Sequence, residues 1–370
     1  MSEARRAVPS LSFNGANVTT KLEKYLEKLS YTDIASGTSD SLSIELQNIE
    51  MKWLADWFPT KGSKISGSIS FKNWDKEFVN LSLNLGTFVL DEVKFSGGPL
   101  MLTMGAVAIP ANQSFKSRER TKTWKKVTIK KIAQGIAKRY KLSLSYSAPN
   151  VSISSIEQSK KSDSAFLSEL CDKYGIAMKV FNKKLVIYDH KAAEKGKVVA
   201  NISRKNFIAD KWDFVDSLNG VYTGGRISYK NPKKSSSNKK EKDISIYLGF
   251  KEENAAGART LKINETCSSR KDAYYKAAAK VNESNREATV ITGTMWANPK
   301  ICAGVCVNVT GMGKANGKYY VDEVTTEISS SGTTQDVSMH KCQPQLTYSA
   351  KKKKTRKKKK KKKKKTTTRR

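Results

Sequence analysis

The stretch GTFVLDEV at residues 86–93 returns as GKYYVDEV at residues 317–324. In each copy an aromatic residue, a branched aliphatic residue and a final valine make one apolar face of a β-strand, and the leading glycine marks the turn before it. The flanks repeat too. A Pro/Gly turn and a strand precede each copy, and a glycine turn and another strand follow it. The sequence therefore predicts two related β-modules in one chain.

Length and composition set the outer limits. A chain of 370 residues has room for two or three domains, and its 38% hydrophobic residues recur in periodic segments that should fold. We expect no signal peptide and no membrane-spanning segment, because no apolar run approaches 18 residues. Five irregularly spaced cysteines fit synthesis in a reducing cytoplasm.

The net charge of +35 is unevenly distributed. Residues 351–370 hold thirteen lysines, three arginines and no acid, which leaves +19 on residues 1–350. Such a balance favours polyanions or acidic protein surfaces as neighbours, although solvated lysine faces explain it equally well. We expect the tail to be disordered, since it has no apolar residue to bury.

The predicted fold class is α+β, mainly β, with two antiparallel β-modules and a small α+β domain between them. The predicted boundaries are residues 1–110, 111–197 and 198–347, followed by a tail at 348–370. In the first module an apolar stripe over residues 18–29, with Asn17 as N-cap, predicts a helix. A helical turn is expected at residues 51–57. The expected strands of this module are residues 11–13, 42–46, 65–71, 81–85, 88–95 and 100–109.

The middle domain is expected to begin with a helix at residues 123–140, followed by a strand at 142–146 and a Ser/Asn-rich loop. A second helix should start at Ser162-Asp163 and end at Gly175. A hairpin, residues 176–181 and 185–188, should close the domain. For the last module we expect a polar loop at 231–242, a helix at 268–284 and strands at 288–295, 305–309, 319–328 and 333–340.

Catalytic, cofactor-binding and metal-ligating residues are not expected. The histidines, His190 and His340, lie in no nucleophile signature, and His190 should be a solvent-exposed residue at a strand end. Cys302, Cys306, His340 and Cys342 have unusual spacing for a zinc site, so packing of small residues is the favoured interpretation.

Other motifs are better explained by structure than by chemistry. Residues 311–319 resemble a phosphate-binding loop, but Met312 and Tyr319 occupy positions that need glycine and Ser/Thr, so a hairpin turn is favoured. The pairs Asp91-Glu92 and Asp322-Glu323 point to opposite faces of their strands, which excludes a glycosidase pair and suggests a shared structural role. Trp53 and Trp57, four residues apart, favour core packing over a binding surface.

Several segments resemble, in order, the phage late control gene D protein family, the baseplate hub proteins of contractile tails. The first set is NGANVT at 14–19, YTD at 31–33, DSLSI at 40–44, KW at 52–53, PTKG at 59–62 and GTFVLDE at 86–92. The second set is SDSAFL at 162–167, Asn298-Pro299 through Gly304, Gly311 with Gly313, and GKY at 317–319. Thr326, where a histidine is expected, and the lysine tail depart from the family pattern.

This resemblance implies two tail-tube-like β-barrels per chain and a homotrimer, so that six similar barrels adapt a six-fold tube to a three-fold spike. It also implies a location in the virion, at the tail baseplate. The expected partners are the tail tube protein, the central spike protein, the tape-measure protein and other baseplate proteins. The ring would enclose a channel, lined by lysines, through which DNA could pass.

Two alternatives stay open at this point. The charge and the tail would also suit a nucleic-acid-binding protein, which predicts binding to DNA with a steep dependence on salt. A cell-wall hydrolase associated with the tail is disfavoured by the missing His and carboxylate constellations. The sequence does not distinguish a complete phage from a phage-tail-like bacteriocin.

Overall fold

The computed structural model describes residues 4–37, 39–74, 79–108, 114–230 and 243–347. Its largest feature is a 13-stranded sheet built from both ends of the chain. The N-terminal elements are β1 (Arg6–Phe13), β2 (Ala16–Asn17), α1 (Thr19–Glu23), β3 (Leu26–Ile34), β4 (Ser41–Gln47), the 3-10 turn η1 (Lys52–Leu54), β5 (Lys64–Lys72), β6 (Leu81–Ser96) and β7 (Met101–Val107).

The C-terminal part of the same sheet starts after residue 197. Its elements are β13 (Val198–Ser203), η2 (Arg204–Asn206), β14 (Phe207–Asp216), β18 (Thr289–Trp296), β19 (Cys306–Thr310), η3 (Gly313–Ala315), β20 (Gly317–Ser329) and β21 (Gly332–Lys341). A separate three-stranded sheet and a long helix are inserted between β14 and β18. They consist of β15 (Gly224–Lys230), β16 (Asp243–Gly249), β17 (Thr260–Ile263) and α6 (Arg270–Arg286).

The two β-modules share one strand order. Neighbouring strands run β3-β4-β7-β6-β5-β1 in the first module and β14-β18-β21-β20-β19-β13 in the second. Each strand of the first module therefore has a counterpart at the same place in the sheet and in the chain order of the second module. The pairs of counterparts are β1 and β13, β3 and β14, β4 and β18, β5 and β19, β6 and β20, and β7 and β21. One pair differs in direction, because β1 is antiparallel to β5 whereas β13 is parallel to β19. The predicted pair of related modules is thus present in the fold.

The repeated motif has the same geometry in both copies. The β6–β7 ladder shifts register between Leu90 and Glu92, and the β20–β21 ladder shifts between Val321 and Glu323. Each shift is a β-bulge with an aspartate as the extra residue. The bulge changes the alternation by one position, so that the motif valine, and not the glutamate, faces the core.

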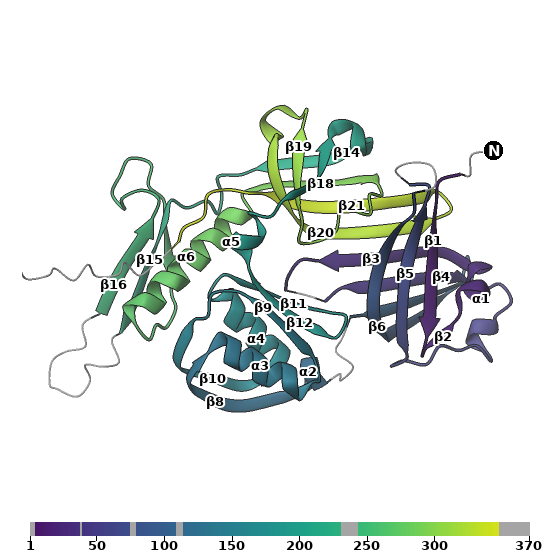
Figure 1. Cartoon of the computed structure of the whole chain (residues 1–370), viewed down its shortest axis with the longest axis horizontal. Coiled ribbons are helices and arrows are strands. Elements are labelled where there is room, and N and C mark those ends of the chain that lie inside the picture. Colours follow the sequence, from purple (N-terminus) through teal and green to yellow (C-terminus); the bar gives the residue numbers. More distant parts are fainter. Residues whose placement is uncertain (1–3, 38, 75–78, 109–113, 231–242, 348–370) are drawn as a thin grey trace, which may run out of the picture.

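The modules are joined through a strand ladder. The second half of β20 pairs with β3, from Glu323 opposite Ile34 to Ser329 opposite Lys28. Figure 1 shows β3 and β4 lying beside β20 and β21, so the two modules form one continuous surface. The two expected barrels therefore share a sheet within the chain.

The middle of the chain forms its own sheets and its own core. Its elements are α2 (Ser114–Ser117), β8 (Glu119–Thr128), α3 (Ile129–Arg139), β9 (Ser143–Ser147), β10 (Ser152–Ser162), α4 (Asp163–Asp172), β11 (Ile176–Phe181), β12 (Lys184–Asp189) and α5 (His190–Ala193). Strand β8 pairs with β10, and β12 pairs with β11 and β9. Apolar residues of α3 and α4 pack between these sheets, among them Ile132 and Leu167.

Three local predictions were wrong. The stripe over residues 18–29 forms only one helical turn, α1, because from Leu26 the chain joins the ladders with β4 and β20. The helix predicted at 123–140 starts at Ile129, where the side chain of Thr128 caps it, and the preceding residues form β8. The segment expected as a Ser/Asn-rich loop supplies β10, which pairs with β8.

Other predictions are confirmed. Helix α4 begins at Asp163, with Ser162 as its N-cap and Gly175 at φ +66° after its end. The hairpin β11–β12 and helix α6 lie close to their predicted positions. A fourth prediction was wrong: β6 is one strand where two were predicted, because Leu85 and Gly86 form a bulge opposite Gly67, with Gly86 at φ +92°, and the strand continues through it.

Residues 231–242 and 348–370 lie outside the described residues, so the expectations for the polar loop and the lysine tail stay predictions. Among the helices of the described ranges, none is long and apolar enough to cross a membrane.

Candidate functional site: buried joints between the modules

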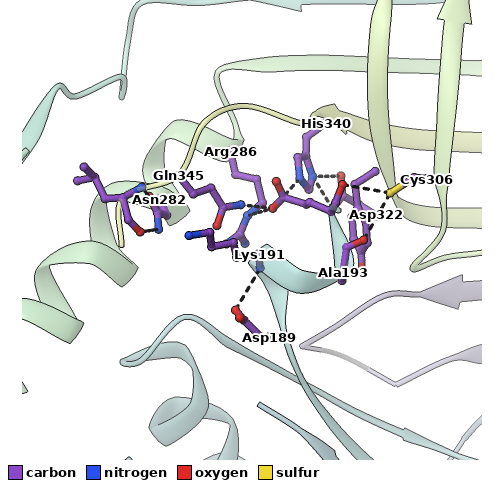
Figure 2. Close-up of polar contacts among 12 residues, drawn as sticks. Asp189, Lys191, Ala193, Asn282, Arg286, Cys306, Asp322, His340 and Gln345 are labelled. Atoms are coloured by element: carbon purple, nitrogen blue, oxygen red, sulfur yellow. Dashed lines mark hydrogen bonds and ion pairs between the residues drawn. The ribbon is translucent and has the colours of Figure 1, made fainter. Parts of the chain in front are cut away.

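The motif aspartate of the second β-module, Asp322, is partly exposed and belongs to a polar cluster where three parts of the chain meet (Figure 2). Nδ1 of His340 lies 2.8 Å from each carboxylate oxygen of Asp322, and Nε2 lies 3.4 Å from Oε1 of Glu194. The same Glu194 oxygen lies 3.5 Å from Nε of Arg286, at the end of α6. His340 is 3% exposed and Glu194 6% exposed. We call Glu194, Arg286, Asp322 and His340 the histidine joint.

The two histidines near this joint have opposite protonation behaviour. Burial by itself would lower the pKa of His340, but its hydrogen bonds to Asp322 and the nearby carboxylates of Asp322 and Glu194 outweigh it and raise that pKa. Burial, followed by the positive charges of Arg286 and His340, lowers the pKa of His190 to about 3. The prediction that His190 is solvent-exposed was wrong, because α5 starts directly after β12 and holds the ring against Tyr188.

Of the cysteines weighed as zinc ligands, Cys306 packs in an apolar cluster. Cys306 is 1% exposed, lies in an apolar cluster with Tyr320 and Ala35, and donates from Sγ to the carbonyl oxygens of Ala193 and Glu194, both at 3.5 Å. Burial is the main cause that raises the pKa of its thiol, which opposes formation of a thiolate nucleophile. Within the described ranges, no group of three or more His, Cys, Asp or Glu side chains is arranged to hold a metal ion.

A second buried joint links the middle domain to the first β-module. Nζ of Lys179, on β11, binds a carboxylate oxygen of Asp33 and lies 3.0 Å from Oδ1 of Asp40. The other Asp33 oxygen accepts a hydrogen bond of 2.9 Å from the backbone N–H of Ala303, in the second β-module. Burial alone would lower the pKa of Lys179, but the two carboxylates outweigh it and raise that pKa. We call Asp33, Asp40 and Lys179 the lysine joint.

The middle domain also touches the motif glycine of the first module. A side chain at Gly86 would start 3.2 Å from the ring of Phe181, at the end of β11. Gly86 adopts φ +92°, a conformation that side-chain-bearing residues rarely take. The backbone conformation therefore favours glycine, and any side chain at this position would also have to displace the ring of Phe181 slightly.

The remaining sequence candidates have structural roles. Trp53 is 8% exposed and lies in the core of the first module, as predicted, but Trp57 is 41% exposed. The two rings do not share a helical face, because η1 ends at Leu54; they meet edge-to-face with centroids 5.3 Å apart. The phosphate-loop-like stretch holds η3, which connects β19 to its antiparallel partner β20, so it is the predicted hairpin turn.

One face of the joined sheet, which we call the polar face, carries both acidic and basic side chains. Glu323, Glu327 and Asp336 lie on it, and Nζ of Lys28 lies 2.7 Å from Oε2 of Glu327.

The sequence pointed to Asp33, Asp40, Asp322 and His340 but not to Lys179, Glu194 and Arg286. Lys179 had a signal, since it is a lone charge in the apolar strand β11. Glu194 and Arg286 had none, because only the tertiary fold brings the end of α5 and the end of α6 to His340. In both joints the charged groups pair with one another. The joints connect the middle domain to the two β-modules.

Comparison with known proteins identifies the architecture. Residues 106–332 match the family model described as phage tail baseplate hub (GPD). The chain is 29% identical over 230 residues to the probable baseplate hub protein of Escherichia phage 186, and 26% identical over 232 residues to that of Escherichia phage P2. Each match covers 60% of this chain and 57% of the relative, so the chain aligns with little more than half of those proteins.

Among solved structures, the fold is similar to that of the 43 kDa tail protein of prophage MuSo2 from Shewanella oneidensis. The TM-score is 0.67 at 13% identity, and the match covers 90% of this chain and 98% of the other.

Proposed function

Because the chain belongs to the phage tail baseplate hub family, we propose that it is the baseplate hub of a contractile phage tail or a phage-tail-like particle. In this role it is a homotrimer that joins the six-fold tail tube to the three-fold central spike. The observation that carries the proposal is the duplicated β-module, with the same strand order and the same aspartate bulge in both copies.

The duplication supports the adaptor role through symmetry. Three chains with two similar modules each present six similar surfaces to a six-fold partner. The chain as a whole repeats only three times, which suits a three-fold partner on the opposite side. Closed cyclic symmetry is the usual solution for homo-oligomers.

The two joints support a rigid rather than a moving adaptor. The histidine and lysine joints tie the middle domain to both β-modules through charged contacts that are buried, except for the partly exposed Asp322. Removing either partner of such a contact leaves an uncompensated buried charge. The modules therefore keep a fixed relation under the load of tail contraction.

The proposed domains keep their predicted limits: β-modules at residues 1–110 and 198–347, an α+β domain at 111–197 and a basic tail at 348–370. We place the middle domain beside the ring, because its strands pair only with one another and with none of the 13-stranded sheet. The proposed role is structural and not enzymatic.

The proposed location is the tail baseplate of the virion, after synthesis in the host cytoplasm. The tube, the spike, the tape-measure protein and other baseplate proteins are the proposed partners, with DNA passing through the channel of the ring. The mixed charge of the polar face suits a channel that does not hold the DNA backbone tightly.

Deletion of the gene, with complementation in trans, tests this function. Without the chain, electron microscopy and protein analysis of particles should show tails that lack spike and baseplate at one end. Wild-type particles should contain the chain at that end. Normal spikes and baseplates in the deletion strain would refute the hub role, and strong retention of residues 1–350 on DNA at physiological salt would favour nucleic-acid binding instead.

A further inference from the structure

The ladder between β20 and β3 shows how one β-module binds the next. Thr32 and Thr325 lie opposite each other with their Oγ atoms 3.0 Å apart. Lys28 and Glu327, diagonal neighbours across the same ladder, form the 2.7 Å ion pair of the polar face. Beyond the last pair, the backbone N–H of Ala35 donates to the carbonyl of Asp322 at 2.8 Å, and Ala35 is 4% exposed. This contact joins the first module to the second within one chain.

The counterparts of these two edges have no partner strand within the described chain. Strand β6 is the counterpart of β20, and its edge beside β5 is paired only as far as Leu90, which bonds to Gly62 and Ser63. Strand β14 is the counterpart of β3, and it pairs only with β18. The end of β6 and the outer edge of β14 are therefore open at the positions where β20 and β3 meet.

The ladders fix which residues correspond. Ala106 of β7 and Met339 of β21 hold equivalent positions, because each pairs with the residue directly before the aspartate bulge. Ala106 pairs on its other side with Leu42, and Met339 pairs with Ile291. Those residues pair in turn with Tyr31 of β3 and Phe214 of β14. In this alignment Thr32 corresponds to Val215, and Ala35 corresponds to Leu218.

Exposure marks the same edge. Val215 is 55% exposed and Leu218 is 77% exposed, whereas the corresponding Ala35 is buried in the contact within the chain. Apolar side chains this exposed at an unpaired strand edge favour pairing with another chain. The intramolecular ladder identifies the complementary edge.

We infer that β14 of one copy adds to the open end of β6 in a second copy, in the register of the β20–β3 ladder. Phe214 then lies opposite Phe95, and Val215 lies opposite Lys94. Asp213 becomes the diagonal neighbour of Lys94, with the same diagonal offset as Lys28 and Glu327 but two residues farther along the strands, and these two side chains can form an ion pair. Leu218 is covered beside Asp91, the motif aspartate of the first module.

This contact is heterologous, because β14 and β6 are different surfaces of the same chain. A heterologous contact generates a ring when its rotation closes. The inference rests on the proposed function for the number of copies, which is three. The ring then alternates contacts within and between chains, all with one strand-to-strand geometry.

Paired cysteines in particles assembled from full-length chains test the register. In the variant with Lys94→Cys and Val215→Cys, the new thiols face each other across the contact, at the spacing of directly opposed residues. The control combines Lys94→Cys with Lys211→Cys, which shifts the second thiol by four residues, about 13 Å along the strand. After treatment with a short thiol cross-linker, the first variant should run as a three-chain species that a reductant separates, and the control should run as single chains.

Charge reversal provides a second readout if the cysteine variants assemble poorly. Lys94→Asp and Asp213→Lys should each reduce incorporation of the hub into particles, and the double variant should restore it. Three hub copies per particle with neither cross-linking nor rescue would refute this contact while leaving the hub function intact. Wild-type particles without the chain would refute the hub function itself.

Discussion

Lys179 pairs with two carboxylates that the fold has removed from water. Asp40 is fully buried and Asp33 is 8% exposed. Replacing Lys179 with methionine would leave both without a cation, and loss of one partner from a buried ion pair costs about 3–5 kcal/mol. We expect urea unfolding of Lys179→Met to show a loss of that size. Lys184→Met, at an exposed position on β12, is the control and should differ from wild type by less than about 0.5 kcal/mol. Equal stability of the two variants would contradict the role of the lysine joint.

The two histidines should give opposite pH effects on stability. His190 has a pKa of about 3 in the fold and an ordinary value near 6.5 when unfolded, so the unfolded state binds more protons between these values. His190 therefore lowers the free energy of unfolding as the pH falls below 6.5. The free energy of unfolding of His190→Gln should therefore decline less than that of wild type between pH 7 and pH 5.

For His340 the sign is reversed, because its pKa is raised in the fold. The stability that it contributes is fully present below pH 6.5 and is lost as pH rises through the folded pKa. We expect His340→Gln to lose more stability at pH 5 than at pH 8, measured by denaturant unfolding. A larger loss at pH 8 would show that the charges of Asp322 and Glu194 do not stabilise the protonated ring.

At the scale of elements, the middle domain should fold alone. Its core consists only of residues between Phe115 and Ile187, and Ser162 caps α4 from within it. A fragment of residues 111–197 should unfold cooperatively with temperature. Leu167→Ala should cost it about 2–5 kcal/mol, since Leu167 is fully buried. A fragment without a cooperative transition would refute the proposed domain boundary.

Local sequence patterns predicted most strands but missed those that form only through pairing with another strand. The motif strands, α4 and the hairpin β11–β12 carry turn and capping residues that act locally, so their positions followed from the sequence. Strands β3, β8 and β10 depend on partners distant in the chain, and their own residues also suited helix or loop. The same reason hid Glu194 and Arg286 from the sequence.

For the whole molecule, the basic tail should contribute nothing to the stability of the body. It has no apolar residue to bury, and its like charges repel one another. Thermal melts of the full-length chain and of residues 1–350 should coincide. A melting temperature several degrees lower after truncation would mean that the tail packs on the body.

The central claim is that two β-modules per chain convert three-fold into six-fold symmetry. It is tested most directly by the copy number and symmetry of the chain in intact particles, resolved by cryo-electron microscopy without imposed symmetry. The account predicts three chains whose six β-modules all contact the tail tube, with the spike on the three-fold axis below. Six chains per tail tip, or a ring in which only one module of each chain contacts the tube, would contradict it.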